Sequence, residues 1–299
     1  MKTGAYNGEG MKMLRLGAHL SIAKGLPKTV TMAKEIKANT FQYFTRNPRG
    51  GAAREIPPSE IAAWQEARQR AGLYPIAGHL PYTVNLGAVP GRQQEFARMV
   101  LHDDTLRVAA IGGEYLITHP GHHEGDREAS LERIIQVIKE SYLSIPEPGP
   151  MLLLETMAGQ GKEVGSLEDL RSILACLEWP EKVGVCLDSA HLFAAGWDLR
   201  TPSGCRQLVK ELEAKIGLER VKVMHLNDSL APLGSHRDRH AGIGRGELGE
   251  EGIAAIVNDP FLGELTLLLE TPVSTYEEYG AEIALVQKLR LDGSREPVL

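Results

Sequence analysis

The sequence predicts an α/β protein folded as a single (β/α)₈ TIM barrel. Eight short apolar runs can be identified along the 299 residues, and from the second onward they lie roughly 30 to 45 residues apart. The gaps between them carry amphipathic helical patterns. The runs are continuously apolar, which is typical of parallel strands buried on both faces. A doubly wound open sheet is the alternative fold with the same alternation.

Each apolar run is expected to form one strand, and the runs follow one another in the order that a barrel requires. They are Leu14–Ala18, Thr40–Phe44, Tyr74–Ala77, Tyr115–Ile117, Met151–Leu154, Val183–Leu187, Val221–Met224 and Leu265–Leu269.

Three of the gaps show clear helical patterns. Ser59–Ala71 follows two prolines, and Glu128–Ser144 places its apolar side chains near one face. Leu167–Leu177 is preceded by Ser166 as the expected N-cap and has Asp169 in its first turn. These segments are expected to cover the barrel.

Composition and charge limit the possible classes of function. Hydrophobic residues make up 42% and charged residues 24%, a globular balance without a disordered signature. The net charge of −6 excludes a global basic field, so nucleic-acid binding must use local Arg and Lys clusters or bound cations. The three cysteines form no CxxC or paired framework, which favours a reduced, cytoplasmic setting.

One domain is expected over residues 14–299, because no stretch rich in Pro, Ser or Gly divides the chain. Residues 1–13, MKTGAYNGEGMKM, lack the apolar core of a signal peptide and are expected to form a flexible tail. No apolar run approaches the roughly 20 residues that span a bilayer, so no membrane association is expected. The expected state is a monomer.

Polar residues stand where six of the apolar runs end. The C-terminal ends of the strands open on one face of a parallel barrel, so these side chains are expected to converge at one mouth. In chain order they are His79, His119, Glu155, Asp188 with His191 three residues on, His225 and Glu270.

The segment Val221–His240, VKVMHLNDSLAPLGSHRDRH, shows this pattern most clearly. It begins as an apolar strand, breaks at His225 into a polar loop, and places Asp238 and His240 two residues apart. Side chains at i and i+2 of an extended segment point the same way, so both can reach one ion. Imidazole and carboxylate are the ligands that zinc or manganese takes in hydrolytic sites.

Any one of these nine residues has an ordinary structural explanation. A histidine at a strand end is often a hydrogen-bonded structural residue, and a carboxylate there is often a helix N-cap, as Asp228 could be. Four converging carboxylates without cations, however, would repel one another. Nine ligands also exceed the about four that one zinc takes, so the sequence predicts about three ions with a carboxylate bridging two of them.

Other motifs carry less information. Gly244–Gly249 matches GxGxxG, but it follows a loop rather than a strand, so we interpret it as a turn and not as a dinucleotide site. His19 is expected at the mouth, behind the ligands. His122 and His123 are expected to be solvated.

The chain contains, in this order, the segments GAHLS, GHLPYTVNLG, THPGHH, LLLETMAGQG, VGVCLDSAHLFAAGWDLRTP, MHLNDS, DRHAGIGRGELG and LLLETP. Together they resemble the endonuclease IV family of zinc-dependent apurinic/apyrimidinic endonucleases, which are TIM barrels. The resemblance runs from about Leu14 to Leu289.

The resemblance implies three zinc ions, with manganese possible at one or more positions. It also implies that Glu155 bridges two ions and that Glu270 orients the attacking water, so both are expected to be catalytic. The implied ligands are His79, His119 and Glu155 for the first ion, Glu155, Asp188, His225 and Glu270 for the second, and His191, Asp238 and His240 for the third.

The substrate implied by the resemblance is double-stranded DNA with an abasic site, cut in base excision repair on the 5′ side to leave a 3′-hydroxyl and a 5′-deoxyribose phosphate. Family members flip the abasic nucleotide out and fill the gap with loop side chains. The corresponding positions are Arg49, Tyr82 and Thr83, and Arg239 is an expected phosphate contact. Some relatives carry a larger apolar residue in place of Thr83 and an aromatic in place of Gly51, which leaves the filling of the gap open.

Two other functions are compatible with the barrel. A sugar isomerase or epimerase of the xylose-isomerase-like barrels shares the fold and a metal-lined mouth, but has no use for a third ion held by His191, Asp238 and His240. A lesion-binding protein without chemistry would not need all nine ligands. The sequence does not distinguish zinc from manganese, and it does not address 3′-repair, exonuclease or nucleotide-incision side activities.

Overall fold

The computed structural model describes residues 13–49, 52–146 and 149–293. Except for Met13, the expected tail over residues 1–13 lies outside this described part, as does Gly51. Eight strands coincide with the eight apolar runs, and their ends differ from the predicted ones by at most two residues. They are β1 (Arg15–His19), β2 (Thr40–Phe44), β3 (Ile76–His79), β4 (Tyr115–Thr118), β6 (Met151–Glu155), β8 (Val183–Asp188), β9 (Val221–His225) and β12 (Thr266–Leu269).

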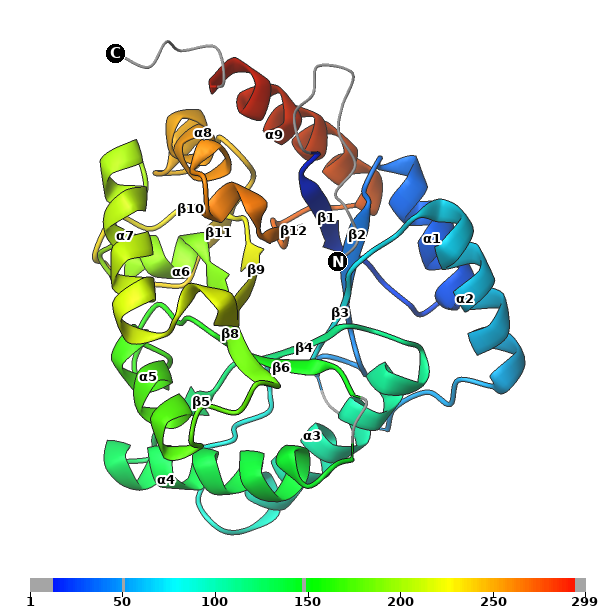
Figure 1. Ribbon diagram of the computed structural model, residues 1–299, viewed down its shortest axis with the longest axis vertical. Helices are drawn as coiled ribbons and strands as arrows, with labels where there is room; N and C mark the ends of the chain where they lie inside the picture. Colours follow the sequence, from blue (N-terminus) through cyan, green and yellow to red (C-terminus); the bar gives the residue numbers. More distant parts are fainter. Residues whose placement is uncertain (1–12, 50–51, 147–148, 294–299) are drawn as a thin grey trace.

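These strands are parallel and close a barrel in the order β1-β12-β9-β8-β6-β4-β3-β2 (Figure 1). The predicted TIM barrel is therefore confirmed. The open-sheet alternative is wrong, because β1 pairs with both β2 and β12 and leaves no free edge. In the described part of the chain we find no helix with the length and apolar character needed to cross a membrane.

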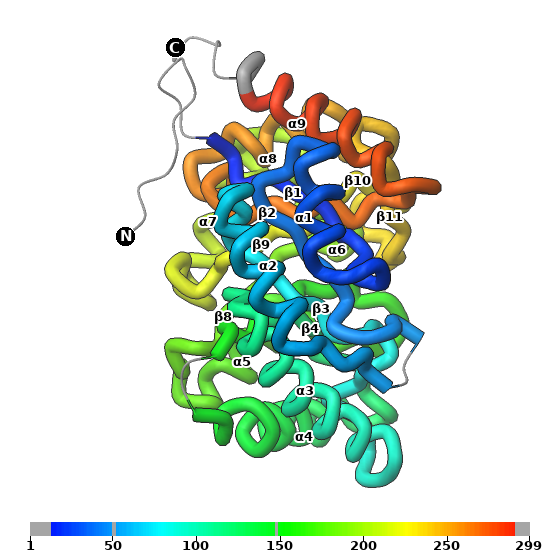
Figure 2. The backbone as a smooth tube through the Cα atoms, turned by 90° about the vertical axis from the view of Figure 1, so that its right-hand side faces the viewer, coloured from blue at the N-terminus to red at the C-terminus, as the bar shows by residue number. Residues whose placement is uncertain are grey.

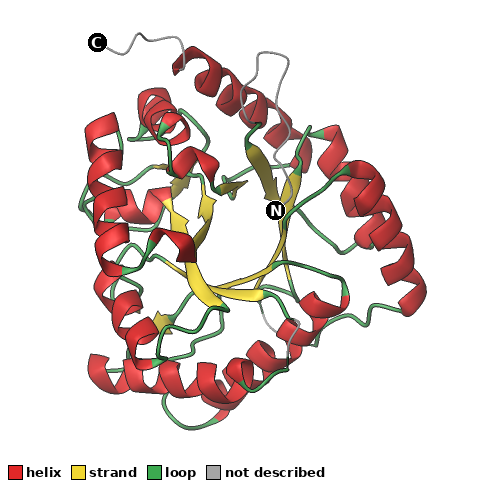
Figure 3. Cartoon of the chain, in the orientation of Figure 1, coloured by secondary structure: helices red, strands yellow, loops and turns green. Residues whose placement is uncertain are grey.

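Helices form a ring outside the strands (Figure 3). From the side, α1 and α2 lie in front of β1, β2 and β3 (Figure 2). The helices are α1 (Leu26–Glu35), α2 (Pro58–Ala71), α3 (Arg92–Ala110), α4 (Arg127–Ile138), α5 (Leu167–Cys176), α6 (Ser189–Ala194), α7 (Pro202–Lys215), α8 (Gly249–Asn258) and α9 (Tyr279–Gly293). Four two-residue strands, β5 (Gly121–His122), β7 (Glu163–Val164), β10 (Asp228–Ser229) and β11 (His240–Ala241), pair within loops.

The structure tests two predicted features of the helices, the N-cap of α5 and the end of the helix expected over Glu128–Ser144. The N-cap of α5 is confirmed, since Ser166 accepts a hydrogen bond from the Asp169 N–H in a capping box. The helix predicted over Glu128–Ser144 instead ends as α4 at Ile138 and continues as a π-helical turn, Lys139–Leu143. That wider turn rotates the following side chains. It contains the buried Tyr142, whose hydroxyl oxygen lies 2.8 Å from the carbonyl oxygen of Pro150 and 2.7 Å from that of Lys182.

The barrel interior explains why the polar residues share one mouth. Six strands each contribute one side chain to a small apolar cluster inside the barrel. Its members are Ala77, Ile117, Leu153, Cys186, Val223 and Leu268. Side chains of a strand alternate, so the residue two positions later also points inward. Those residues are His79, His119, Glu155, Asp188, His225 and Glu270. The chain thus places a polar layer directly above an apolar one.

Asp228, considered above as a helix N-cap, caps a helix that is distant in sequence. It is fully buried, and its carboxylate accepts hydrogen bonds from the N–H groups of Ser229, Gly246, Leu248 and Gly249, at 2.7 to 3.2 Å. The amides of Gly246, Leu248 and Gly249 lead into α8. A Cβ at Gly246 would lie 2.5 Å from Asp228 Oδ1, which explains the glycine. The GxGxxG segment is therefore a turn, as predicted, and the structure adds that it wraps around a carboxylate.

Replacing Asp228 with alanine is expected to lower the free energy of unfolding by about 3 kcal/mol or more, because several buried N–H groups lose a charged acceptor. Asp228→Asn keeps one oxygen in place and is expected to lose less. Equilibrium urea unfolding of the three proteins measures the difference. An unchanged unfolding midpoint for Asp228→Ala would contradict this account.

Candidate metal centre

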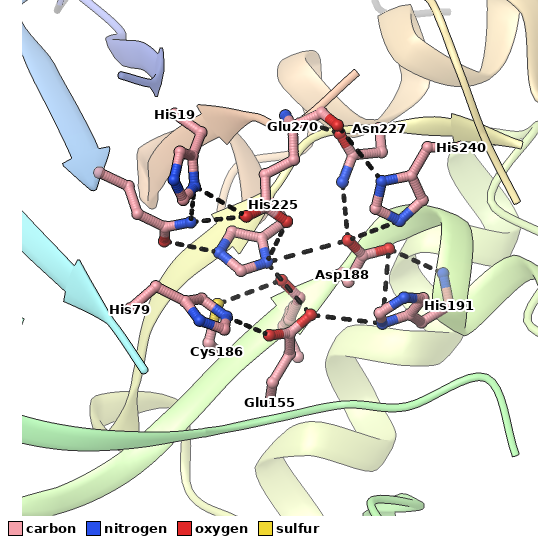
Figure 4. A network of polar contacts seen from close by, with 12 residues as sticks. His19, His79, Glu155, Cys186, Asp188, His191, His225, Asn227, His240 and Glu270 are labelled. Carbon is pink, nitrogen blue, oxygen red and sulfur yellow. Dashed lines mark hydrogen bonds and ion pairs between the residues drawn. The ribbon is translucent and has the colours of Figure 1, made fainter. Parts of the chain in front are cut away.

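The structure brings the nine predicted ligand side chains together at the C-terminal mouth of the barrel. Figure 4 shows most of them around Glu155, with α6 supplying His191 and the loop after β10 ending at His240. Side chains of this set form four overlapping groups, and within each group the ligand atoms lie within 4.8 Å of one another. The groups are His79, His119 and Glu155; His79, His225 and Glu270; Glu155, Asp188, His225 and Glu270; and Asp188, His191 and His240.

Glu155 lies between two of these groups, and its side chain is 1% exposed. Its Oε2 atom is 3.2 Å from Nε2 of His79 and 3.4 Å from Nε2 of His119. Its Oε1 atom is 3.2 Å from Nδ1 of His225 and 3.3 Å from Nδ1 of His191. One carboxylate oxygen thus faces one pair of histidines and the second oxygen faces the other pair, which is the arrangement that a bridging ligand needs.

Three histidines are oriented by backbone carbonyl groups. Nδ1 of His79 lies 2.5 Å from the oxygen of Leu80, and Nδ1 of His191 lies 2.9 Å from the oxygen of Thr156. Nδ1 of His240 lies 3.4 Å from the backbone carbonyl oxygen of Glu270. A carbonyl can only accept, so Nδ1–H donates and the Nε2 lone pair is left to face the centre.

Two of these lone pairs belong to the third ligand set that the sequence predicted, His191, Asp238 and His240. Among the described residues, Nε2 of His191 and Nε2 of His240 are buried and have no hydrogen-bond partner. Both lie 3.3 Å from Oδ1 of Asp238. Buried nitrogens without a partner are costly, and a cation between them and the carboxylate would remove that cost. The donor set therefore fits a metal ion.

Asn227 supports two of the candidate ligands. It is fully buried, and its Nδ2 donates to Oδ2 of Asp188 at 2.7 Å. Its Oδ1 accepts from the Glu270 N–H at 2.9 Å. Asp188 is held again through Oδ1, which accepts the N–H of His191 at 2.7 Å. Asn227 was not predicted from the sequence, although it stands two residues after His225 at a strand exit.

Charges within the centre shift its pKa values in opposite directions. Burial alone would raise the pKa of Glu155, but the His225 and His119 rings hold it well below its ordinary value. Burial alone would lower the pKa of His191, but Asp188 and other neighbouring carboxylates hold it well above. The pKa of His225 is raised in the same way by the acidic groups around it. A metal ion that binds here must displace protons from these rings.

Comparisons with known proteins identify the family. A family model described as "Xylose isomerase-like TIM barrel" matches residues 30–289. A relative from Moorella thermoacetica, named "Probable endonuclease 4", is 79% identical over 277 residues, which are 93% of this chain and 99% of the relative. The chain belongs to the endonuclease IV family.

The resemblance found in the sequence is thereby confirmed, and a solved structure agrees with it. Endonuclease IV from Thermus thermophilus superposes with a TM-score of 0.81 at 34% identity, covering 93% of this chain and 99% of that one. A D-tagatose 3-epimerase-like protein superposes with a TM-score of 0.63 at 17% identity, covering 93% and 97%. That likeness shows the shared fold alone, so the endonuclease IV assignment is favoured over a sugar epimerase.

The side chains predicted to contact DNA lie on loops at the same end of the barrel. Tyr82 follows β3, is 54% exposed, and has its ring 6.2 Å from that of Phe44. Thr83 is exposed beside it, and Arg49 is exposed on the loop after β2. Arg239 is exposed between two candidate ligands. Their contacts with DNA remain predictions of the resemblance to endonuclease IV.

The remaining histidines at this end differ in position. His19 has Nδ1 3.4 Å from Oε1 of Glu270, so it stands directly behind a candidate ligand, as expected. His122 is exposed, with Nε2 3.2 Å from the Asn85 side chain, and His123 contacts the Gly125 carbonyl. Neither His122 nor His123 belongs to the groups of candidate ligands found in the described residues.

Proposed function

We propose that this protein is a metal-dependent endonuclease IV that hydrolyses double-stranded DNA on the 5′ side of an abasic site, leaving a 3′-hydroxyl and a 5′-deoxyribose phosphate. The proposed setting is base excision repair in the cytoplasm, by a monomer whose residues 14–299 form one domain. The observation that carries this proposal is Glu155, a buried carboxylate with one oxygen facing each of two histidine groups.

The proposed cofactors are three zinc ions, with manganese possible at one or more positions. When bound, such ions would supply Lewis-acid activation of water and would offset charge on the phosphate oxygens. The proposed ligands are His79, His119 and Glu155 for one ion, Glu155, Asp188, His225 and Glu270 for the second, and His191, Asp238 and His240 for the third. The two partnerless ring nitrogens beside Asp238 support the third set.

The chain's own side chains would then position the reaction. Glu155 would keep two cations at a fixed separation, because its buried carboxylate cannot turn away toward solvent. Glu270 is 18% exposed and is therefore partly accessible to water at the mouth. We propose that it orients the attacking water toward the phosphorus. No serine, cysteine or separate histidine base is required.

DNA would approach over the exposed loops at the mouth. A cavity of about 1050 Å³ opens beside His19 and Phe44 and is lined in part by Lys24 and Lys28. In a chain of net charge −6, local cations of this kind are what a phosphate backbone requires. We propose that Arg49, Tyr82 and Thr83 occupy the gap left by the flipped nucleotide and that Arg239 contacts a phosphate.

Replacing Tyr82 with alanine is expected to weaken binding of abasic-site DNA by about 10- to 100-fold, because one aromatic contact with a base contributes about 1–3 kcal/mol. The side chain is 54% exposed, so the fold should not change. Tyr74, 41% exposed at the other end of β3, provides the matched control Tyr74→Ala. Equal affinities of the two variants in a fluorescence-anisotropy titration would contradict a DNA contact at Tyr82.

Mapping the cut in an end-labelled duplex with one abasic site tests the proposed function. The expected product is a single nick on the 5′ side of the lesion with a 3′-hydroxyl end, and no nick in the intact duplex. Metal content is measured on the same preparation. Aldose–ketose turnover with one ion per chain and no nicking would favour a sugar isomerase instead.

A further inference from the structure

Gln42 lies in the middle of β2, in the sequence TFQYF, and its side chain is fully buried. It pairs in register with His19 of β1, and both side chains reach the polar layer above the barrel core. A buried amide inside an otherwise apolar strand is costly unless all its hydrogen bonds are made. Its partners therefore indicate why the residue is there.

The partners determine which way the amide points. Nε2 of Gln42 lies 2.6 Å from Oε1 of Glu270, and an ionised carboxylate can only accept, so the amide nitrogen must face it. The second N–H reaches Nδ1 of His19 at 3.0 Å. The amide oxygen then faces Nε2 of His225 at 2.9 Å, so that nitrogen must carry a proton and donate.

This proton fixes the role of the other nitrogen of His225. With Nε2–H donated to Gln42, Nδ1 is the atom that faces the centre, 3.1 Å from Oε2 of Glu270 and 3.2 Å from Oε1 of Glu155. The histidines at 79, 191 and 240 are held by backbone carbonyls, which no substitution removes. His225 is held by a side chain, and this makes its orientation testable.

We infer that Gln42 is a positioning residue that presents Nδ1 of His225 and one oxygen of Glu270 to the same metal ion. This inference rests on the proposed metal centre. Partners that orient metal ligands typically contribute 10- to 100-fold in affinity. Gln42 would do so for two ligands at once, from a strand that supplies no ligand itself.

The test uses the full chain with Gln42→Met, which keeps an unbranched side chain of similar length and removes both hydrogen-bonding groups. The matched control is Gln94→Met in α3, since Gln94 is also buried and donates to the Ala88 carbonyl, with no hydrogen bond to a candidate ligand among the described residues. Thermal unfolding of the metal-free proteins checks that both variants fold. Gln42→Leu provides a second variant without hydrogen-bonding groups.

Affinity for Zn²⁺ is measured by competition with a chelator of known affinity. Gln42→Met is expected to bind at least one ion about 10- to 100-fold more weakly, whereas Gln94→Met should stay within about twofold of the unmodified chain. Loaded with Co²⁺, the Gln42 variant should also show a changed visible absorption, which reports ligand geometry. Unchanged affinity and an unchanged cobalt spectrum would overturn the role of Gln42 alone. If the unmodified chain binds no Zn²⁺, the metal centre fails as well.

A measurement without substitution gives an independent check. In the zinc-loaded protein labelled with ¹⁵N in histidine, the His225 ring is expected to keep its proton on Nε2 and to show metal coordination at Nδ1. A proton on Nδ1 with the metal on Nε2 would overturn the inference, whatever the variants show.

Discussion

Replacing Glu155 with alanine is expected to reduce incision of abasic-site DNA by at least about a thousandfold, because the variant would lose the proposed shared ligand of two cations that would offset charge on the phosphate. The buried carboxylate faces His79 and His119 with one oxygen and His191 and His225 with the other. Single-turnover nicking of an abasic duplex, together with metal content per chain, measures the effect.

One further variant at this position separates the effect of the charge from that of side-chain size, and a second variant on α4 serves as a control. Glu155→Gln keeps the size of the side chain but not its charge, and is expected to lose nearly as much activity as Glu155→Ala. Glu132→Ala removes an exposed carboxylate on α4 and should cut as the unmodified chain does. Circular dichroism confirms folding of each protein. Incision by a folded Glu155→Ala variant at the unmodified rate would refute the bridging role.

Removing the metal ions is expected to abolish incision completely and to lower the melting temperature. Ligand binding to the folded state stabilises it, so a protein that loses the proposed metal ions loses that contribution. The buried nitrogens of His191 and His240 would again be without a partner. The experiment treats the protein with strong chelator, verifies metal loss by elemental analysis, and measures nicking and thermal unfolding before and after adding Zn²⁺.

The pH dependence of metal removal has a definite sign. The pKa values of His191 and His225 are raised well above the ordinary histidine value, so these rings take up protons as pH falls and can no longer act as ligands. Extraction by chelator should therefore be faster at pH 6 than at pH 8. Activity that persists after verified metal removal would rule out metal catalysis.

Much of this centre could be predicted from local sequence. Apolar runs that each end in a histidine or carboxylate identify strands and ligand candidates together. Side chains alternate along a strand, so the residue two positions after an interior residue also points into the barrel. Ala77 with His79 and Leu153 with Glu155 show this directly. Motif resemblance then identified the family, which the comparisons confirmed.

Other features had only a weak local signal. The π-helical turn after α4 contains Tyr142, whose hydroxyl contacts the carbonyl oxygens of Pro150 and Lys182 in later segments. The carboxylate of Asp228 receives amides from a turn about twenty residues further along the chain. Neither partner is visible in the periodicity of its own segment, because the pattern reports burial and not which atoms meet.

The sequence by itself determined the strands, the end of the barrel at which the polar residues lie, and the types of ligand atoms available, since all three follow from the order of apolar and polar residues. Only the tertiary structure decided which nitrogen of each histidine faces the centre and which buried amides hold the ligands. Gln42 and His225 are 183 residues apart. Their 2.9 Å hydrogen bond forms because closure of the barrel brings β2 and β9, which are not adjacent strands, around one axis. Such a contact depends on geometry at the scale of a hydrogen bond, which residue order alone does not specify.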